Sequence, residues 1–110
     1  MSKDKIYIFD TTLRDGAQTE GVDFSIEDKN KIANDLSDIG VDYIEGGWPG
    51  ANPVDTKFFS DPPKIKKSIF TAFGMTKKTG RSADNDPGLA SLINANTSAV
   101  CVVGKAWDFH

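Results

Sequence analysis

The sequence has little cysteine and histidine, with one of each among 110 residues. A single cysteine, Cys101, cannot form an internal disulfide, which fits the reducing cytoplasm. No apolar run approaches the roughly 20 residues of a membrane span, and the first residues lack the apolar core of a secretory signal. Positive charge is not in excess, because 13 Lys and Arg stand against 16 Asp and Glu. We therefore expect a cytoplasmic protein with neither nucleic acid nor a membrane as partner.

What the sequence does contain is an alternation of short apolar runs and helix-like segments within a length that allows one core. Strands are expected at residues 6–9, 41–44, 68–73 and 99–103. Helices are expected at about residues 26–39, 53–59 and 87–93. Strict alternation of this kind predicts an α/β fold with a parallel sheet.

The first strand and the first helix carry clear local signals. The run from Ile6 to Phe9 is β-branched and aromatic, so we expect a strand that is buried on both faces. Ser25 and Asp28 form an approximate capping box, and Gly40 suits the position just past the helix end. Apolar residues at helical spacing predict the buried face of this helix: Ile26, Ile32, Ala33, Leu36 and Ile39.

Two architectures share this pattern, an open doubly wound sheet and a (β/α)8 TIM barrel. A dinucleotide-binding sheet would place Gly-x-Gly-x-x-Gly after the first strand, whereas this sequence has a charged cluster from Asp10 to Asp15. Polar side chains at the carboxyl end of a strand are typical of a barrel, which needs eight strands and about 250 residues. We therefore expect residues 1–110 to be the N-terminal half of a TIM-barrel catalytic domain, truncated after four strands and three helices.

The loop after the first strand presents side chains suited to metal and oxyanion chemistry. Asp15 is a hard oxygen ligand of the kind that Mg²⁺ or Mn²⁺ prefers. Arg14 carries a planar fork of donors that suits a carboxylate or a developing enolate oxygen. Adjacent opposite charges can equally form a surface ion pair of little energetic value. The residues alone leave these two interpretations open.

The run from Asp10 to Gly16, followed by Ala17 and Gln18, resembles the signature of the metal-dependent barrels that condense or cleave 2-oxo acids. This superfamily contains isopropylmalate, homocitrate and citramalate synthases and hydroxymethylglutaryl-CoA lyase. The resemblance implies that Arg14 binds and polarises the 2-oxo group and stabilises the enolate, and that Gln18 lies near the substrate. It also implies that Asp15 ligates a divalent metal, with Mg²⁺ or Mn²⁺ ahead of Zn²⁺. Acetyl-CoA as co-substrate and a homodimer of the full-length enzyme are further implications.

Glu45 ends the second predicted strand, at the mouth of a barrel, where a carboxylate could orient substrate or transfer a proton. Capping of nearby backbone N–H groups is the alternative. The resemblance implies that a Glu at this place is catalytic. Residues 46–53 (GGWPGANP) are more similar to the citramalate synthase branch than to the Ala-Gly-Phe-Pro of isopropylmalate synthases, and residues 71–76 and 80–87 point the same way.

Several other side chains have two interpretations. The basic residues Lys77, Lys78 and Arg81 either form a solvated loop or contact the phosphates of coenzyme A or a substrate carboxylate. Cys101 is expected to act as a small buried hydrophobe. The superfamily supplies two metal ligands as a His-x-His pair from a late strand. This sequence has one His, His110, which we do not assign to the metal.

The resemblance implies that the chain is the N-terminal portion of an acyltransferase of branched-chain amino-acid biosynthesis. The favoured reaction is a metal-assisted Claisen-type condensation of acetyl-CoA with pyruvate to citramalate. The alternative acceptor is 2-oxoisovalerate, as in 2-isopropylmalate synthase, and a lyase is a weaker third possibility. From another class, the chain would be a non-catalytic half barrel that only folds or associates. We expect the 110 residues alone to be inactive because the metal site is incomplete.

Overall fold

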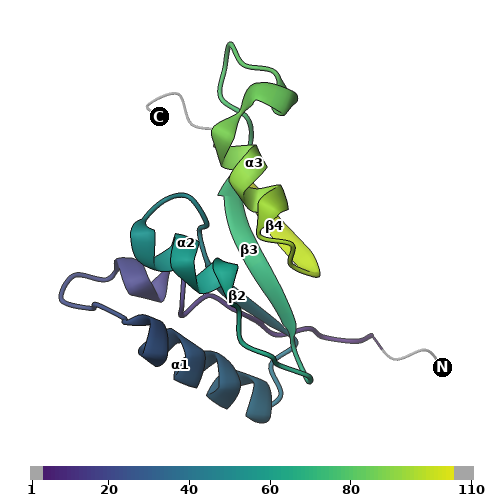
Figure 1. Ribbon diagram of the computed structural model, residues 1–110. Helices are drawn as coiled ribbons and strands as arrows, with labels where there is room; N and C mark the ends of the chain where they lie inside the picture. Colours follow the sequence, from purple (N-terminus) through teal and green to yellow (C-terminus); the bar gives the residue numbers. More distant parts are fainter. Residues whose placement is uncertain (1–3, 106–110) are drawn as a thin grey trace.

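Strands and helices alternate along the whole of the computed structural model, which describes residues 4–105 (Figure 1). The elements are, in order, β1 (Phe9–Asp10), η1 (Gly16–Gln18), α1 (Ile26–Asp38), β2 (Tyr43–Gly47), α2 (Pro53–Ser60), β3 (Ile69–Met75), η2 (Ala83–Asn85), α3 (Pro87–Asn94) and β4 (Ala99–Val103). Here η1 and η2 are single 3₁₀ turns. No helix among these residues is long and apolar enough to cross a membrane.

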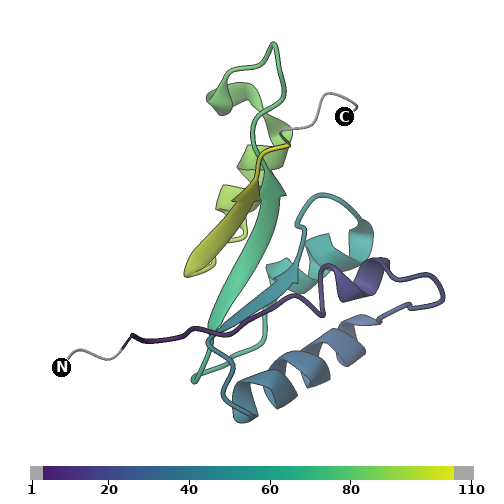
Figure 2. The same ribbon diagram turned by 180° about the vertical axis from the view of Figure 1, so that it is seen from behind.

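The four strands form one parallel sheet in the order β1-β2-β3-β4. A doubly wound sheet carries helices on both faces, whereas a barrel carries them only on the outer face. Here α1, α2 and α3 all lie on one face, as the two opposite views show (Figures 1 and 2). The arrangement confirms the predicted α/β fold and matches the N-terminal part of a (β/α)8 barrel.

Each helix begins at a residue whose side chain caps the first turn. The Ser25 hydroxyl accepts a hydrogen bond from the Asp28 amide at 3.1 Å, and the Asp28 carboxylate accepts one from the Ser25 amide at 3.0 Å. This reciprocal pair confirms the predicted capping box. The Asn52 and Asp86 side chains cap α2 and α3 by accepting a hydrogen bond from the Asp55 and Leu89 amides, and each cap is followed by a proline at the first helical position.

The core lies between the sheet and the three helices, in two clusters that share one aromatic residue. The first cluster is Leu13, Ala33, Ile44 and Phe58, and the second is Phe59, Ala72, Leu92 and Ala95. Phe70 packs against both clusters, with ring centroids 5.6 Å from Phe58 and 5.2 Å from Phe59. Helix packing on this one face therefore fixes the positions of the strand ends that carry the polar residues.

Two of the sequence predictions about burial are wrong. The run from Ile6 to Phe9 is exposed rather than buried on both faces, and β1 itself is limited to Phe9–Asp10. Among the described residues β1 pairs only with β2, so its outer edge and much of its surface have no neighbour to bury them. Ile39 is also exposed, because α1 ends at Asp38 and Ile39 is the capping residue beyond its last turn.

Candidate active site

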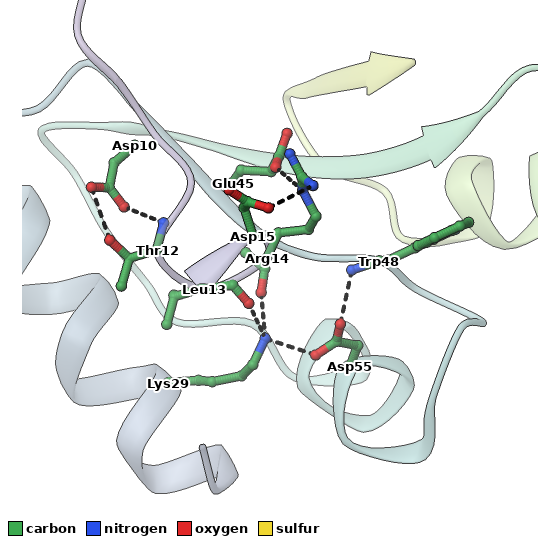
Figure 3. Close-up of polar contacts among 10 residues, drawn as sticks. Asp10, Thr12, Leu13, Arg14, Asp15, Lys29, Glu45, Trp48 and Asp55 are labelled. Carbon is green, nitrogen blue, oxygen red and sulfur yellow. Dashed lines mark hydrogen bonds and ion pairs between the residues drawn. The ribbon is translucent and has the colours of Figure 1, made fainter. Parts of the chain in front are cut away.

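Arg14 and Glu45 meet at the carboxyl ends of β1 and β2 (Figure 3). The Arg14 Nε donates a hydrogen bond to the Glu45 Oε1 at 2.5 Å. The Glu45 side chain is fully buried, whereas 20% of the Arg14 side chain is exposed. Neighbouring parallel strands end at the same edge of a sheet, so two side chains 31 positions apart reach one another. The two residues predicted as catalytic therefore form a short charge-assisted hydrogen bond.

The guanidinium of Arg14 also lies over an aromatic ring. Its Cζ is 4.2 Å from the centroid of the Phe73 ring, a distance typical of a cation–π contact. Phe73 in turn packs edge-on against Trp48, with the ring centroids 5.1 Å apart. Among the described residues, neither terminal nitrogen of Arg14 donates a hydrogen bond, and the Asp15 carboxylate is 3.7 Å from Nη1. Both nitrogens are thus held in place and available to a ligand oxygen.

One oxygen of the Glu45 carboxylate is also available. Its Oε2 is buried and has no hydrogen-bond partner among residues 4–105. Buried carboxylate oxygens are normally paired, so an unpaired one at a strand end is a feature of a working site rather than of a stable core. Glu45 can therefore use Oε1 to orient Arg14 and Oε2 to exchange a proton with a reacting group.

Cys101, on β4, lies on the same side of the sheet as this pair. Burial raises the pKa of the Cys101 thiol, and the negative charge of the neighbouring Glu45 carboxylate raises it further, against a smaller opposing effect of Arg14. A raised pKa keeps the thiol protonated and poorly nucleophilic. Cys101 is half-buried rather than buried as predicted, and its neutral thiol lies beside the Arg14–Glu45 pair.

The structure places Asp15 and Gln18 beside Arg14, in the loop after β1. Asp15 is 67% exposed, and among the described residues its side chain forms an ion pair with Arg14 alone. Gln18, in η1, lines a cleft of about 330 Å³ together with Arg14, Lys29 and Asp55. The four residues predicted for the site are thus adjacent, but only Arg14 and Glu45 are joined by a hydrogen bond.

The described residues supply one candidate metal ligand rather than a metal site. Asp15 offers an exposed carboxylate, which fits a hard divalent ion. No group of three or more His, Cys, Asp or Glu side chains gathers anywhere between residues 4 and 105. His110 lies outside the described residues. Because such an ion takes several ligands, the residues present fit a partial site that other ligands would complete.

Two site residues escaped the sequence analysis, Lys29 and Asp55. Their side chains form a buried ion pair, with the Lys29 Nζ 2.7 Å from the Asp55 Oδ1. A lysine on a helix is usually solvated, which is why it drew no attention. Its position was nevertheless a signal, since Lys29 lies at helical spacing from Ile26 and Ala33, on the face that α1 buries.

The basic residues after β3 line a separate cleft of about 740 Å³, together with Lys105 and Trp48. Lys77, Lys78, Arg81 and Lys105 are exposed, and none forms an ion pair with another described residue within 4.0 Å. Asp86 also lines the cleft, but its carboxylate accepts hydrogen bonds from the Lys78 and Leu89 amides, which lower its pKa. The cleft therefore carries an excess of positive charge in an acidic chain.

Known proteins with sequences similar to this chain include citramalate synthases and 2-isopropylmalate synthases. The chain is 52% identical over 109 residues to the (R)-citramalate synthase of Aquifex aeolicus, which covers 97% of this chain and 21% of that protein. It is 46% identical over 107 residues to the (R)-citramalate synthase of Geobacter sulfurreducens, covering 96% and 20%. A 2-isopropylmalate synthase of Sulfurisphaera tokodaii is 36% identical over 106 residues, covering 96% and 26%. The chain thus spans about a fifth to a quarter of these relatives.

The family assignment rests on a family model and on the relatives just described. Residues 5–84 match the model of the HMGL-like family, a stretch that runs from before β1 to η2 and includes Arg14 and Glu45. The relatives cover nearly all of the chain, including α3 and β4. The chain therefore belongs to the HMGL-like family.

Proposed function

We propose that residues 1–110 form the first part of the TIM-barrel catalytic domain of an acyltransferase that condenses acetyl-CoA with a 2-oxo acid. The observation that carries this proposal is the Arg14–Glu45 pair at the carboxyl ends of β1 and β2, because barrel enzymes place their active sites at that end of the strands. Pyruvate is the proposed acceptor and citramalate the product. Its support is the 52% identity to a citramalate synthase, against 36% to a 2-isopropylmalate synthase.

Arg14 would bind the acceptor through its two available terminal nitrogens. These donors suit the oxo oxygen and carboxylate of a 2-oxo acid, and the positive charge stabilises the alkoxide that forms when the acetyl carbon attacks. Gln18 would contact the same substrate from η1. Asp15 would hold a divalent ion, Mg²⁺, Mn²⁺ or Zn²⁺, which when bound supplies Lewis acidity to the 2-oxo group.

Glu45 would transfer a proton during the condensation. Its Oε1 is committed to Arg14, whereas the buried Oε2 has no partner among the described residues. A carboxylate in this position can take a proton from a reacting group and return it in a later step. The hydrogen bond to Arg14 would keep the carboxylate in one orientation throughout.

The basic cleft after β3, defined by Lys77, Lys78, Arg81 and Lys105, is our proposed location for the phosphates of acetyl-CoA. Its excess positive charge suits phosphate oxygens. It also lies next to the candidate site, because Trp48 lines the cleft and contacts Phe73, over which Arg14 is stacked.

The test is a chimera in which residues 1–110 replace the matching segment of the Aquifex aeolicus citramalate synthase. We expect turnover of acetyl-CoA with pyruvate, and a loss of at least ~100-fold in kcat for Arg14→Lys and Glu45→Gln. The exposed variant Lys31→Gln serves as the control and should retain full activity. Clear preference for 2-oxoisovalerate would contradict the citramalate assignment. Steady turnover by the 110 residues alone would contradict the incomplete metal site.

A further inference from the structure

The buried cation Lys29 binds backbone carbonyls next to the candidate site. Its Nζ donates hydrogen bonds to the Leu13 carbonyl at 2.9 Å and to the Gly46 carbonyl at 2.7 Å (Figure 3). The third contact is the ion pair with Asp55 at 2.7 Å. An ammonium group has three donors, so all of them are used. The side chain is 2% exposed and forms no hydrogen bond or ion pair with the Arg14 and Glu45 side chains themselves.

The two carbonyls that Lys29 binds flank the catalytic pair. Leu13 comes directly before Arg14, and Gly46 comes directly after Glu45. One nitrogen atom therefore joins the β1–α1 loop to the end of β2, at the residues adjacent to the Arg14–Glu45 hydrogen bond. Any change in the Lys29 contacts would alter the separation of these two backbones, and with it the distance between the two side chains.

Asp55 extends this connection along the chain that follows Glu45. Its Oδ2 accepts a hydrogen bond from the Trp48 amide at 2.9 Å, while its Oδ1 pairs with Lys29. Gly47, the residue before Trp48, has φ +149°, and a Cβ at this position would lie 2.7 Å from the Asp55 carboxylate. The pairing of β2 with β3 also shifts register between Glu45 and Gly47. Lys29 and Asp55 together therefore hold the backbone in place where β2 departs from a regular strand.

The burial of this pair is poorly explained by stability alone. Removing two opposite charges from water is costly, and well-packed apolar residues often stabilise a core equally well. An exposed counterpart lies on the same helix, where Lys31 pairs with Asp35 at 2.8 Å with 76% and 61% of the side chains exposed. That pair forms no hydrogen bond to the backbone of the loops after β1 and β2 among the described residues. The difference indicates that the buried pair is retained for where it holds the backbone.

We propose that Lys29 and Asp55 are positioning residues of the active site: they fix the separation of the loops after β1 and β2 so that Arg14 and Glu45 meet. The effect on geometry stands on the contacts described above. The effect on turnover rests on the proposed function.

The geometry is tested on the 110-residue chain by NMR of the Arg14 side chain, labelled with ¹⁵N. A hydrogen bond to Glu45 should shift the Arg14 Hε downfield and slow its exchange with water, and Glu45→Gln provides the reference for an altered bond. The double variant Lys29→Met/Asp55→Leu removes both charges, so neither is left buried and alone. We expect the double variant to keep a dispersed backbone spectrum and to lose the Arg14 signature, which is the downfield shift and slow water exchange of Hε. The matched control Lys31→Met/Asp35→Leu should keep both.

A folded double variant with the wild-type Arg14 signature would overturn the proposal. Should the double variant unfold, Lys29→Arg decides, because it keeps the charge but its planar fork cannot place one nitrogen among three oxygens. A folded Lys29→Arg chain with an unchanged Arg14 signal would likewise overturn the proposal.

The same variants in the Aquifex chimera test the effect on turnover. We expect the double variant to lose between ~10-fold and ~100-fold in kcat, as a small misplacement of reacting groups does. Its KM for acetyl-CoA and its Tm should remain close to those of the parent chimera, which separates positioning from unfolding. A double variant with parental kcat would overturn the proposal. An inactive parent chimera would count against the proposed function, while the NMR result would still decide the geometry.

Discussion

The two faces of the sheet hold different kinds of residue. Successive strand residues point to opposite faces, so Ile44 and Ala72 pack against the helices while Glu45 and Phe73 point the other way. We call the first the helix-covered face and the second the site face. The helix-covered face contains the two apolar clusters, whereas the site face carries the Arg14–Glu45 pair and an unpaired carboxylate oxygen. We infer that stability comes mainly from the first and chemistry from the second.

The largest loss of stability is expected for Phe58→Ala, on the helix-covered side. Phe58 is fully buried and contacts Phe59 and Phe70, so truncation leaves a cavity and should cost about 3–5 kcal/mol in the free energy of unfolding. Urea unfolding followed by circular dichroism measures it. The control is Phe9→Ala, on the exposed edge strand, with an expected loss of less than ~1.5 kcal/mol. Equal losses of unfolding free energy in the two variants would contradict the expected difference between the helix-covered face and the sheet edge.

Gly46→Ala should have the next largest effect, because it adds an atom to the same packed layer. A Cβ at Gly46 would lie 2.3 Å from the Phe70 Cζ and 3.2 Å from the Phe59 Cζ. Overpacking of this kind costs about 1–3 kcal/mol. Gly16→Ala is the matched control, because its Cβ would meet Thr12 at an ordinary 3.6 Å. The comparison is made from the unfolding midpoints in urea, and a neutral Gly46→Ala would show that the aromatic cluster is loosely packed.

Glu45→Gln tests the site face and should have a small effect on stability, of about 1 kcal/mol or less. The amide keeps an acceptor for Arg14, and the partly exposed guanidinium can reach water. Neutralising the carboxyl also removes the cost of burying a charge. If this variant lost as much stability as Phe58→Ala, the inference that stability comes mainly from the helix-covered face would be wrong. Urea unfolding of the two variants side by side decides between these outcomes.

The smallest effect concerns pH and the helix that covers β3. Hydrogen bonds from the Lys78 and Leu89 amides lower the pKa of Asp86, the cap of α3. A carboxyl whose pKa is lower in the folded state contributes stability above its ordinary pKa of about 4. That contribution is lost as the pH falls through the folded value. The unfolding midpoint of wild type should therefore approach that of Asp86→Asn as the pH falls from about 5 to 3. A difference that does not change with pH would contradict this.

Much of the fold could be predicted from local sequence signals. The capping side chains of Ser25, Asn52 and Asp86, and the prolines that follow the last two, act within a few residues, so they place helix starts without knowledge of the tertiary structure. The proximity of Arg14 and Glu45 was also predictable, because adjacent parallel strands end together. Burial of the first strand was not, since an apolar run does not reveal whether anything lies beyond it.

The polar interior was the harder part to predict. Lys29 and Asp55 are charged residues on helices, and local sequence gives each of them a solvated role. Their pairing depends on the angle between α1 and α2 and on the turn at Gly47, neither of which is encoded within a few neighbouring residues. Periodicity offered one signal, the place of Lys29 on the buried face of α1.

The order of the strands has a consequence for how the protein folds. Each strand pairs with the next one in sequence, so every pairing closes a loop of roughly 30 residues and costs a similar amount of chain entropy. Parallel pairing across loops of this length is slower than the formation of local helical contacts, so the helices are expected to form before the sheet. Arg14, Lys29, Glu45 and Asp55 all precede β3. We therefore expect the contacts among these four charged residues to form together with β1, β2 and the helices that follow them, before β3 and β4 join the sheet.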